Sequence, residues 1–339
     1  MNTPSKKTIL FLFGGESTEH DVSIMSAKNI YQALDKQRFS PVLCYIDRNG
    51  QWWHTTTIAK PIERTPVIPM LGTSAVVIGN ESFHIDAIFP ALHGRNGEDG
   101  TVQGLATLLH TPIVGCGLDG SFLAMDKTVA KQLLQAVGIP VVPGETYQSS
   151  NMPSFKELTN QLGHVLFVKP ARQGSSVGVS KAKTEAEFKA AFREAAKYDQ
   201  TILIEVAVEK PRELEVAALG STYSPKISVV GEVVPDREFY DYQSKYDNNS
   251  TSQTIIPADI PAQVSDQVRE YAALAFTTLH CRGMARIDFF MATDGSIYLN
   301  EINTLPGFTN ISMYPKLWEA SGIAQTELIT ELIGLAATD

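Results

Sequence analysis

The chain has 339 residues, of which 43% are hydrophobic and 19% are charged. These values are ordinary for a globular protein with a large core and exclude disorder along the whole chain. Domains usually contain roughly 100–200 residues, so two or three are expected. The formal net charge is −9 and no run of five basic residues occurs, which disfavours a nucleic-acid partner.

Cysteine usage and the N-terminal segment bear on location. Cys44, Cys116 and Cys281 are odd in number and show no CxxC spacing. This predicts core thiols in a reducing compartment, and neither a disulfide nor a zinc site. The apolar run at residues 9–13 is too short for a signal sequence or a membrane span. We therefore expect a cytoplasmic protein with no membrane partner.

Strand and helix patterns alternate at the start of the chain. A β-rich run at residues 8–13, a helical stretch at 21–34 and a strand at 41–46 follow one another. This β-α-β order predicts the α/β class with a doubly wound parallel sheet. Up to residue 138, the pattern further predicts a turn at 48–50 that closes a small hairpin, a loop at 55–73, a strand at 85–90 and a helix at 121–137 ended by Gly138.

The remainder of the chain also mixes strands and helices. Residues 236–253 are polar and aromatic and contain no glycine, which predicts an ordered lid. The other expected elements are strands at 165–168, 202–206, 214–219 and 226–234, and helices at 185–196, at 264–280 and from 322 onward.

Two strands, at residues 284–291 and 296–302, are expected to form a hairpin. Asp294-Gly295 between them suits a two-residue turn, which fixes the residues that face each other across the strands. Alternate residues on a strand share a face. Asp288 then lies opposite Glu301, Arg286 lies opposite Asn303, and all four side chains project together.

This shared face predicts a metal site. Two carboxylates directly opposite each other repel unless a cation lies between them. Oxygen ligands suit magnesium, and two such ions could bridge the phosphates of ATP. The alternative is a solvated hairpin whose charges never meet, but the neighbouring Ile287, Phe289 and Ile302 indicate that the opposite face is buried.

A lysine and a glycine-rich loop together predict a phosphate site. Lys169 ends the apolar strand at 165–168, and a buried lysine is rare unless it faces an anion. The loop Gln-Gly-Ser-Ser-Val-Gly at 173–178 follows, and its backbone could approach phosphate closely. An ordinary Gly-Ser turn is the alternative reading.

Residues 115–120 match the GxGxxG pattern of dinucleotide-binding enzymes. No acidic residue lies at 135–140, where the ribose partner belongs, and the match is not in the first β-α turn. We therefore interpret it as a tight turn between domains, and a dehydrogenase stays a weak alternative.

Motifs along nearly the whole chain resemble those of D-alanine–D-alanine ligases and occur in the same order. Single motifs are shared with other ATP-grasp enzymes, but the first, second and Lys245-Tyr246 motifs together are specific to this group. The matching segments are residues 14–23 (GGESTEHDVS), 93–100 (HGRNGEDG), 125–127 (MDK), 169–170 (KP), 174–178 (GSSVG), 239–246 (FYDYQSKY), 286–288 (RID) and 301–307 (EINTLPG).

The resemblance implies a three-domain ATP-grasp fold, with an N-terminal doubly wound domain at 1–122, a central subdomain at 123–212 and a C-terminal subdomain at 213–339. It implies ATP and two Mg²⁺ ions, with Mn²⁺ able to substitute, and Asp288, Glu301 and Asn303 as the metal ligands. Glu205 and the backbone near Val208 would hold adenine, although the gap to Glu213 is one residue longer than usual. The ATP-binding residues it implies are Lys127, Lys169, Ser175, Ser176, Glu205, Val208, Glu213, Lys245, Asn300 and Glu301.

The resemblance also implies the reaction: two D-alanines are joined through a D-alanyl phosphate, for peptidoglycan precursors. Glu19 would bind the first ammonium, and Arg286 with the Gly307 N–H would stabilise the oxyanion. Ser312 and Met313 would meet the second carboxylate. The catalytic set is Glu19, Ser175, Tyr246 and Arg286, with His93, Tyr246, Arg286, Gly307, Ser312 and Met313 beside Glu19 as substrate-binding residues.

Several alternatives stay open. His93 could be an acid–base group, although a loop-structuring or electrostatic role is favoured. Glu19 could be only a first-turn acid, and Lys127 only a surface residue. The activity could be that of a D-alanine–D-lactate ligase or another ATP-grasp amino-acid ligase, or the chain could be a non-catalytic nucleotide-binding protein. The resemblance also implies a homodimer formed through the N-terminal region.

Overall fold

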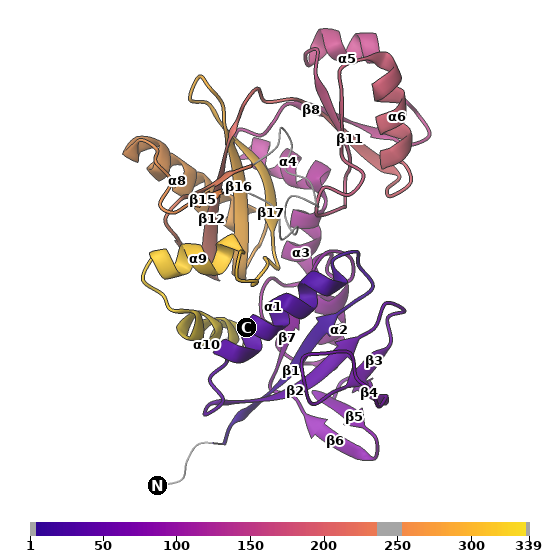
Figure 1. Ribbon diagram of the computed structural model, residues 1–339, viewed down its shortest axis with the longest axis vertical. Coiled ribbons are helices and arrows are strands. Elements are labelled where there is room, and N and C mark those ends of the chain that lie inside the picture. The colour runs from indigo at the N-terminus through magenta and orange to yellow at the C-terminus, as the bar shows by residue number, and fades with distance from the viewer. Residues whose placement is uncertain (1–4, 236–252, 337–339) are drawn as a thin grey trace.

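The computed structural model describes residues 5–235 and 253–336, so the expected lid lies almost wholly outside the described residues. Three sheets form its frame (Figure 1). The first lies in the lower half of Figure 1, in the order β6-β5-β4-β3-β2-β1-β7. Its strands are β1 Lys7–Gly14, β2 Phe39–Ile46, β3 Trp52–His54, β4 Thr65–Met70, β5 Ala75–Ile78, β6 Glu81–His84 and β7 Ala87–Ala91.

Side-chain alternation along β1 places helices on both faces of this sheet. Ile9 and Phe11 pack in the same apolar cluster as residues of α1 (His20–Ala33), whereas Leu10 packs with residues of α2 (Thr101–Leu109). β1 pairs in parallel with β2 and β7. The predicted doubly wound parallel core is therefore confirmed.

A helix from the far end of the chain covers part of the same face of the first sheet as α1. α10 (Gln325–Ala336) lies beside α1 in Figure 1, and its Leu328 and Leu332 belong to the same cluster as Phe11. About 300 residues separate β1 from α10.

The second sheet, at the upper right of Figure 1, has the order β10-β9-β11-β8. Helices α5 and α6 cover one of its faces through a cluster that includes Val168 and Ile204. The other face carries Lys169 and Glu205. The elements are β8 Gly144–Gln148, α5 Phe155–Gln161, β9 Leu166–Pro170, β10 Ser180–Ala182, α6 Glu185–Ala195 and β11 Thr201–Val206.

The third sheet has the order β15-β14-β12-β16-β17, with β13 beside β12. α8 packs on one face and α9 on part of the other, which leaves the rest of that second face for polar side chains. The elements are β12 Arg212–Ser221, β13 Ser224–Ile227, β14 Gly231–Val234, β15 Gln253–Ile255, α8 Ala262–Thr278, β16 Gly283–Met291, β17 Ile297–Asn303 and α9 Met313–Ala320.

Two strand predictions were wrong in part. The loop expected at 55–73 contains β4, whose Pro66 and Pro69 masked its strand character because proline lacks the N–H that a ladder needs. The strand expected at 226–234 is divided into β13 and β14. There the Ser228 hydroxyl accepts the Ala217 N–H at 2.9 Å in place of a backbone carbonyl.

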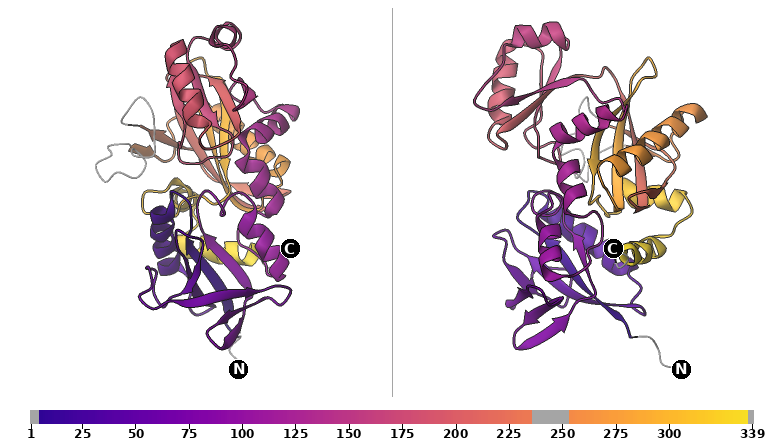
Figure 2. Two further views of the ribbon diagram at one scale, coloured as in Figure 1. Left: turned by 90° about the vertical axis from the view of Figure 1, so that its right-hand side faces the viewer. Right: turned by 180° about the vertical axis from the view of Figure 1, so that it is seen from behind.

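The helix expected at 121–137 is two helices, α3 (Leu118–Met125) and α4 (Lys127–Ala136). Asp126 stands between them with extended backbone, and its carboxylate accepts the N–H groups of Thr128 and Val129. This N-cap starts a new helix, which the apolar pattern alone does not reveal. Gly138, with φ of +83°, ends α4 as expected. Figure 2 shows helices α2, α3 and α4 following one another along one side of the molecule.

The predicted pairing of Asp288 with Glu301 is confirmed, but the predicted turn was wrong. Ala292 donates its N–H to Ser296, so the loop has three residues, Thr293–Gly295, and shifts the register by one. The register shifts back between Asp288 and Phe289, where Asn300 is an extra residue on β17. The two deviations cancel.

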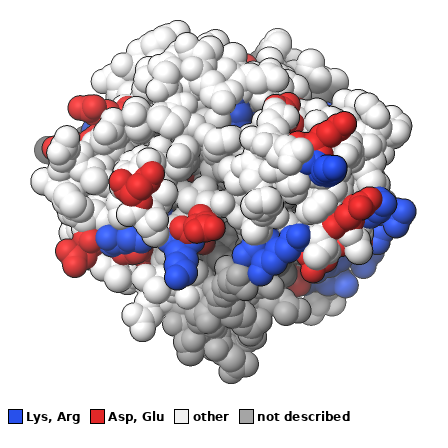
Figure 3. All heavy atoms as spheres, turned by 90° about the horizontal axis from the view of Figure 1, so that it is seen from above, with Lys and Arg blue, Asp and Glu red and all other residues white. Residues whose placement is uncertain are grey.

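Other expectations from composition can be compared directly. All three cysteines are buried and free, as predicted for core thiols. No helix within the described residues is long and apolar enough to cross a membrane. On the face drawn in Figure 3, basic and acidic side chains are interspersed and form no basic patch.

Replacing the cap tests the helix boundary. Asp126→Ala should lower the free energy of unfolding by about 1 kcal/mol, because two N–H groups of α4 lose their acceptor. Denaturant unfolding of both proteins measures the difference. Asp126→Asn keeps an acceptor oxygen and should lose less, and equal losses in the two variants would contradict the cap.

Candidate active site

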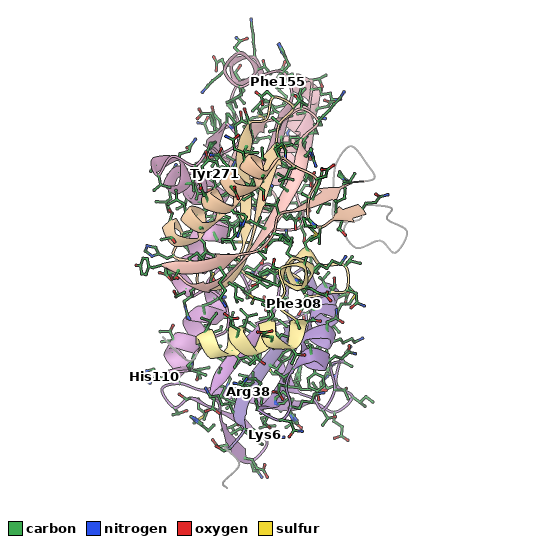
Figure 4. All side chains as sticks on the ribbon, turned by 90° about the vertical axis from the view of Figure 1, so that its left-hand side faces the viewer. Lys6, Arg38, His110, Phe155, Tyr271 and Phe308 are labelled. Carbon is green, nitrogen blue, oxygen red and sulfur yellow. The ribbon has the colours of Figure 1, made fainter. Side chains whose placement is uncertain are left out.

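Loops from all three sheets meet around residues 305–308, which follow β17. Figure 4 labels Phe308 where the upper and lower parts of the molecule join. The Phe308 N–H donates to Ser26 on α1 at 3.1 Å, and the Leu305 N–H donates to Glu98 at 3.4 Å. The Gly-Ser loop of the second sheet reaches the same place through Ser175. The predicted substrate-binding residues Glu19, His93 and Gly307 lie at this meeting point.

Glu19 occupies the N-cap position of α1, where its side chain makes no capping hydrogen bond, and it is buried. Ser175 donates its hydroxyl to one oxygen of Glu19, whereas Tyr246, another member of the expected catalytic set, lies outside the described residues. The other oxygen would lie 2.8 Å from a Cβ at Gly94, where φ is +66°. A side chain at position 94 would therefore displace the Glu19 carboxylate.

His93 is buried and both of its ring nitrogens are engaged. Its Nδ1 lies 3.0 Å from the Leu305 carbonyl, which can only accept, so Nδ1 carries the proton. Its Nε2 then accepts from the Ser26 hydroxyl at 2.9 Å. Burial lowers the pKa of His93, although Glu19 opposes the shift. A neutral ring with both nitrogens occupied supports the loop-structuring role over acid–base catalysis.

Glu98 was not singled out from the sequence, although it stands in the second motif. Its two oxygens accept the N–H groups of Gly94 and Leu305, so it ties the motif to the loop after β17. Burial, and then the nearby charge of Glu19, raise the pKa of Glu98 from 4.5 to about 8. The burial that sets this value is invisible in the local sequence.

The polar face of the hairpin is as predicted. Arg286 holds Asp288 with two hydrogen bonds of 2.7 and 2.6 Å, and Asn303 donates to the same carboxylate at 3.1 Å. Arg286 also lies 3.0 Å from Glu215 on β12, a partner that sequence analysis missed. Burial alone would lower the pKa of Arg286, but Asp288 and Glu215 outweigh it and raise the pKa well above its usual value.

The oxygen donors on the polar face of the hairpin fit magnesium. Across residues 5–235 and 253–336, no three His, Cys, Asp or Glu side chains are grouped as a metal cluster. Asp288 and Glu301 supply two carboxylates, and Asn303 an amide oxygen, on one face of the hairpin. Magnesium commonly takes one or two carboxylates and completes its shell with phosphate oxygens and water. The residues therefore suit an ion that arrives with a nucleotide.

The lysines predicted to bind phosphate are held by neighbours. Lys127, at the start of α4, donates to the Gln173 carbonyl at 2.7 Å and lies 3.4 Å from Glu301. Lys169 forms an ion pair with Glu205, so a predicted phosphate ligand and a predicted adenine ligand contact each other. Lys131 pairs with the other oxygen of Glu205 and was missed by sequence analysis.

The other predicted residues surround this centre. Ser312 accepts the Thr309 N–H at 2.9 Å, and Met313 begins α9. A Cβ at Gly307 would lie 2.7 Å from the Ser312 hydroxyl, so the backbone passes close to that side chain. Lys245, like Tyr246, lies outside the described residues. The remaining predicted ATP ligands are Ser176 in the Gly-Ser loop, Val208 between β11 and β12, Glu213 on β12 and Asn300 on β17.

The glycines of the GxGxxG segment allow it to pack closely against the chain at residues 280–283. A Cβ at Gly120 would lie 2.6 Å from the His280 carbonyl, and a Cβ at Gly283 would lie 2.8 Å from the Gly115 Cα. These glycines bring the segment against the start of β16. This close packing supports the reading of a tight turn over that of a dinucleotide site.

Comparison with known proteins agrees with these observations. Family models described as "D-ala D-ala ligase N-terminus" and "D-ala D-ala ligase C-terminus" match residues 8–116 and 133–334. The chain is 45% identical to D-alanine–D-alanine ligase of Shouchella clausii, over 98% of this chain and 95% of the relative.

Solved structures are similar over the same extent. D-alanine–D-alanine ligase from Coxiella burnetii is 37% identical, with a TM-score of 0.87, over 98% of this chain and 94% of that one. VanG D-Ala:D-Ser ligase from Enterococcus faecalis is 33% identical, with a TM-score of 0.89, over 98% of this chain and 100% of that one.

Glu98 gives this site a predicted pH signature. The folded protein keeps the Glu98 proton between pH 4.5 and about 8, whereas the unfolded chain loses it near 4.5. Stability should therefore fall as pH rises through that window. Melting temperatures of the wild type and of Glu98→Gln between pH 5 and 8.5 measure it. The variant, which cannot ionise, should show the shallower decline, and parallel curves would contradict a raised pKa.

Proposed function

Because this chain belongs to the D-alanine–D-alanine ligase family, we propose roles for its site residues within that family's reaction. The protein is an ATP-dependent carbon–nitrogen ligase with the ATP-grasp fold, and it joins two D-alanines for peptidoglycan precursor synthesis. Its reaction uses ATP with Mg²⁺. The observation that carries the residue roles is the meeting of Glu19, Ser175 and the Arg286 face around residues 305–308.

The reaction has two steps. A carboxylate oxygen of the first D-alanine attacks the γ-phosphorus of ATP, and ADP leaves. The amine of the second D-alanine then attacks the acyl carbon of the D-alanyl phosphate, loses a proton, and phosphate leaves. Both steps move negative charge, so fixed cations and N–H donors should contribute most of the rate acceleration.

Glu19 would hold the ammonium of the first D-alanine. Its carboxylate is buried and fixed by Ser175, so a cation can replace water there with little rearrangement. Arg286 is fixed between Glu215 and Asp288, and with the Gly307 N–H it would stabilise the oxyanion. His93 orients the loop that carries Gly307.

The nucleotide would lie between the second and third sheets. Lys127, Lys169, Ser175 and Ser176 would bind phosphates, Glu205 and the backbone at Val208 adenine, and Glu213 ribose. Asp288, Glu301 and Asn303 would hold one or two Mg²⁺ ions, or Mn²⁺, with Asn300 at the bulge beside them. The ions would neutralise phosphate charge. Lys245 would reach the γ-phosphate from the segment outside the described residues.

The identity of the second substrate needs its own argument, since a D-Ala:D-Ser ligase is among the similar structures. Ser312 and Met313 would meet its carboxylate. Tyr246 would close over the site, and the intact Tyr240-Asp241-Tyr242 and Lys245-Tyr246 argue for an amine over D-lactate as the nucleophile.

We place the domains at 1–122, 123–212 and 213–339, and the protein in the cytoplasm as a homodimer. An exposed apolar stripe on the first domain supports the dimer. Leu108 and Leu118 are 60% and 51% exposed, and a Cβ at Gly104 between them would lie 3.2 Å from Leu118. Leu71 and Phe122 are also exposed; Leu71 precedes Gly72, whose N–H donates to the Leu108 carbonyl, and Phe122 lies one helical turn after Leu118 on α3. Contiguous exposed apolar side chains of this kind mark subunit contacts.

Phosphate release from ATP and Mg²⁺ tests the ligase assignment. Release should depend on D-alanine, with L-alanine and no amino acid as controls, and mass spectrometry should identify D-alanyl-D-alanine. Competition of D-serine and D-lactate with D-alanine as the second substrate measures the nucleophile preference. ATP binding without D-alanine-dependent release would contradict the assignment.

A charge within the apolar stripe tests the dimer. Leu108→Asp should convert a dimer into a monomer, because the charge would be buried in the interface. Light scattering after gel filtration gives the masses. Tyr223→Asp, at a residue 84% exposed in the turn between β12 and β13, is the matched control and should stay dimeric. A monomeric wild type would reject the proposal.

A further inference from the structure

One buried carboxylate in the proposed nucleotide site is shared by two lysines. Glu205 on β11 pairs through one oxygen with Lys169 on β9 and through the other with Lys131 on α4. The three residues are 3%, 8% and 7% exposed. We propose that Lys131 is a positioning residue, which fixes Glu205 for adenine recognition and so frees Lys169 to bind a phosphate. This inference rests on the proposed adenine contact of Glu205.

Packing restricts the Glu205 side chain to this arrangement. Gly144 on β8 faces it, and a Cβ there would lie 2.8 Å from the Glu205 Cγ and 2.5 Å from the Ile204 carbonyl. Lys131 is anchored in turn, because its ammonium also lies 3.3 Å from the Val142 carbonyl. The contact between Lys131 and Glu205 therefore joins two side chains that have little freedom to move apart.

The charges of the triad are unbalanced. Burial lowers the pKa of Lys131, and Glu205 opposes that shift. Burial would raise the pKa of Glu205, but Lys169 and then Lys131 outweigh it and hold the pKa below its usual value. Two ammonium groups thus share one carboxylate, and the excess positive charge favours an anion nearby. A nucleotide phosphate supplies that anion.

The geometry assigns different roles to the two lysines. Lys169 lies next to the last residue of β9, four residues before the start of the Gly-Ser loop where the proposed phosphates lie, so it can turn from Glu205 towards them. Lys131 sits on α4 and keeps Glu205 paired while this happens. Without Lys131, the same movement would leave a buried carboxylate unpaired, which is strongly destabilising. Loss of Lys131 should therefore weaken ATP binding more than it slows chemistry.

A pocket of about 330 Å³ is lined in part by Lys131, whereas Lys169 is not among its lining residues. It lies between α4 and the sheet that carries Glu205. Its polar lining includes Gln132 and Gln135 on α4 and Glu145 on β8. Removal of the Lys131 side chain would join the vacated space to this pocket, which gives a small amine a route to Glu205.

The first experiment separates positioning from a general structural role. Lys131→Met removes the charge but keeps the length of the side chain. The KM for ATP should rise about tenfold or more, with kcat and the KM for D-alanine changed less than about twofold. The preference for ATP over inosine triphosphate, which lacks the exocyclic amine, should also fall. Gln135→Met, on the same helix and lining the same pocket, is the matched control and should keep wild-type values.

The second experiment restores the missing charge. Ethylamine should lower the KM for ATP of Lys131→Ala towards the wild-type value, and the uncharged analogue ethanol should not. An unchanged KM in Lys131→Met, or parallel losses of kcat and melting temperature with purine preference intact, would overturn the inference. Calorimetric binding of ATP tests Lys131 without turnover. A wild type that binds ATP but lacks D-alanine-dependent phosphate release would reject the ligase assignment and leave this binding test standing.

Discussion

The hydrogen bonds that fasten residues 305–308 to the first sheet hold the site together. Glu98 and His93 bind the two backbone groups of Leu305, and Ser26 binds the Phe308 N–H. The bonds of His93 and Ser26 are buried and that of Glu98 is partly buried, so water competes little for them and each lost bond would leave an unsatisfied partner. Glu19 belongs to one sheet and Arg286 to another, and their separation depends on this contact.

The site handles buried charge in two ways. Glu205 and Arg286 keep their charges because opposite charges flank them. Within the described residues the hydrogen-bond partners of Glu98 include no such cation, and a raised pKa lets it keep a proton instead. The first solution holds groups ready for charged ligands, and the second holds a loop in place. An acidic protein thereby keeps a positively charged centre for a polyanionic nucleotide.

The sequence predicted much of this arrangement because its strongest signals are local. The parallel core and the polar face of the hairpin follow from alternation along single strands. Lys131, Glu98 and Glu215 were missed because their partners lie far away in the chain; Leu305, for instance, is 207 residues from Glu98. A signal existed for Lys131, which lies one helical turn after Lys127 and shares its face. The sequence held no signal for the two cancelling register shifts. One lies in the turn that ends at Gly295 and the other at the bulge residue Asn300, and neither changes the apolar pattern of the strands.

The position of α10 has a consequence for synthesis on the ribosome. β1 emerges early, but the α1 face of its sheet is covered partly by Leu328 and Leu332, which are translated about 300 residues later. Until then the nascent sheet exposes apolar surface that a chaperone could occupy. Chains that terminate before α10 would keep that surface open and become targets for proteolysis. The first sheet therefore becomes fully covered only in a chain that has been translated through α10.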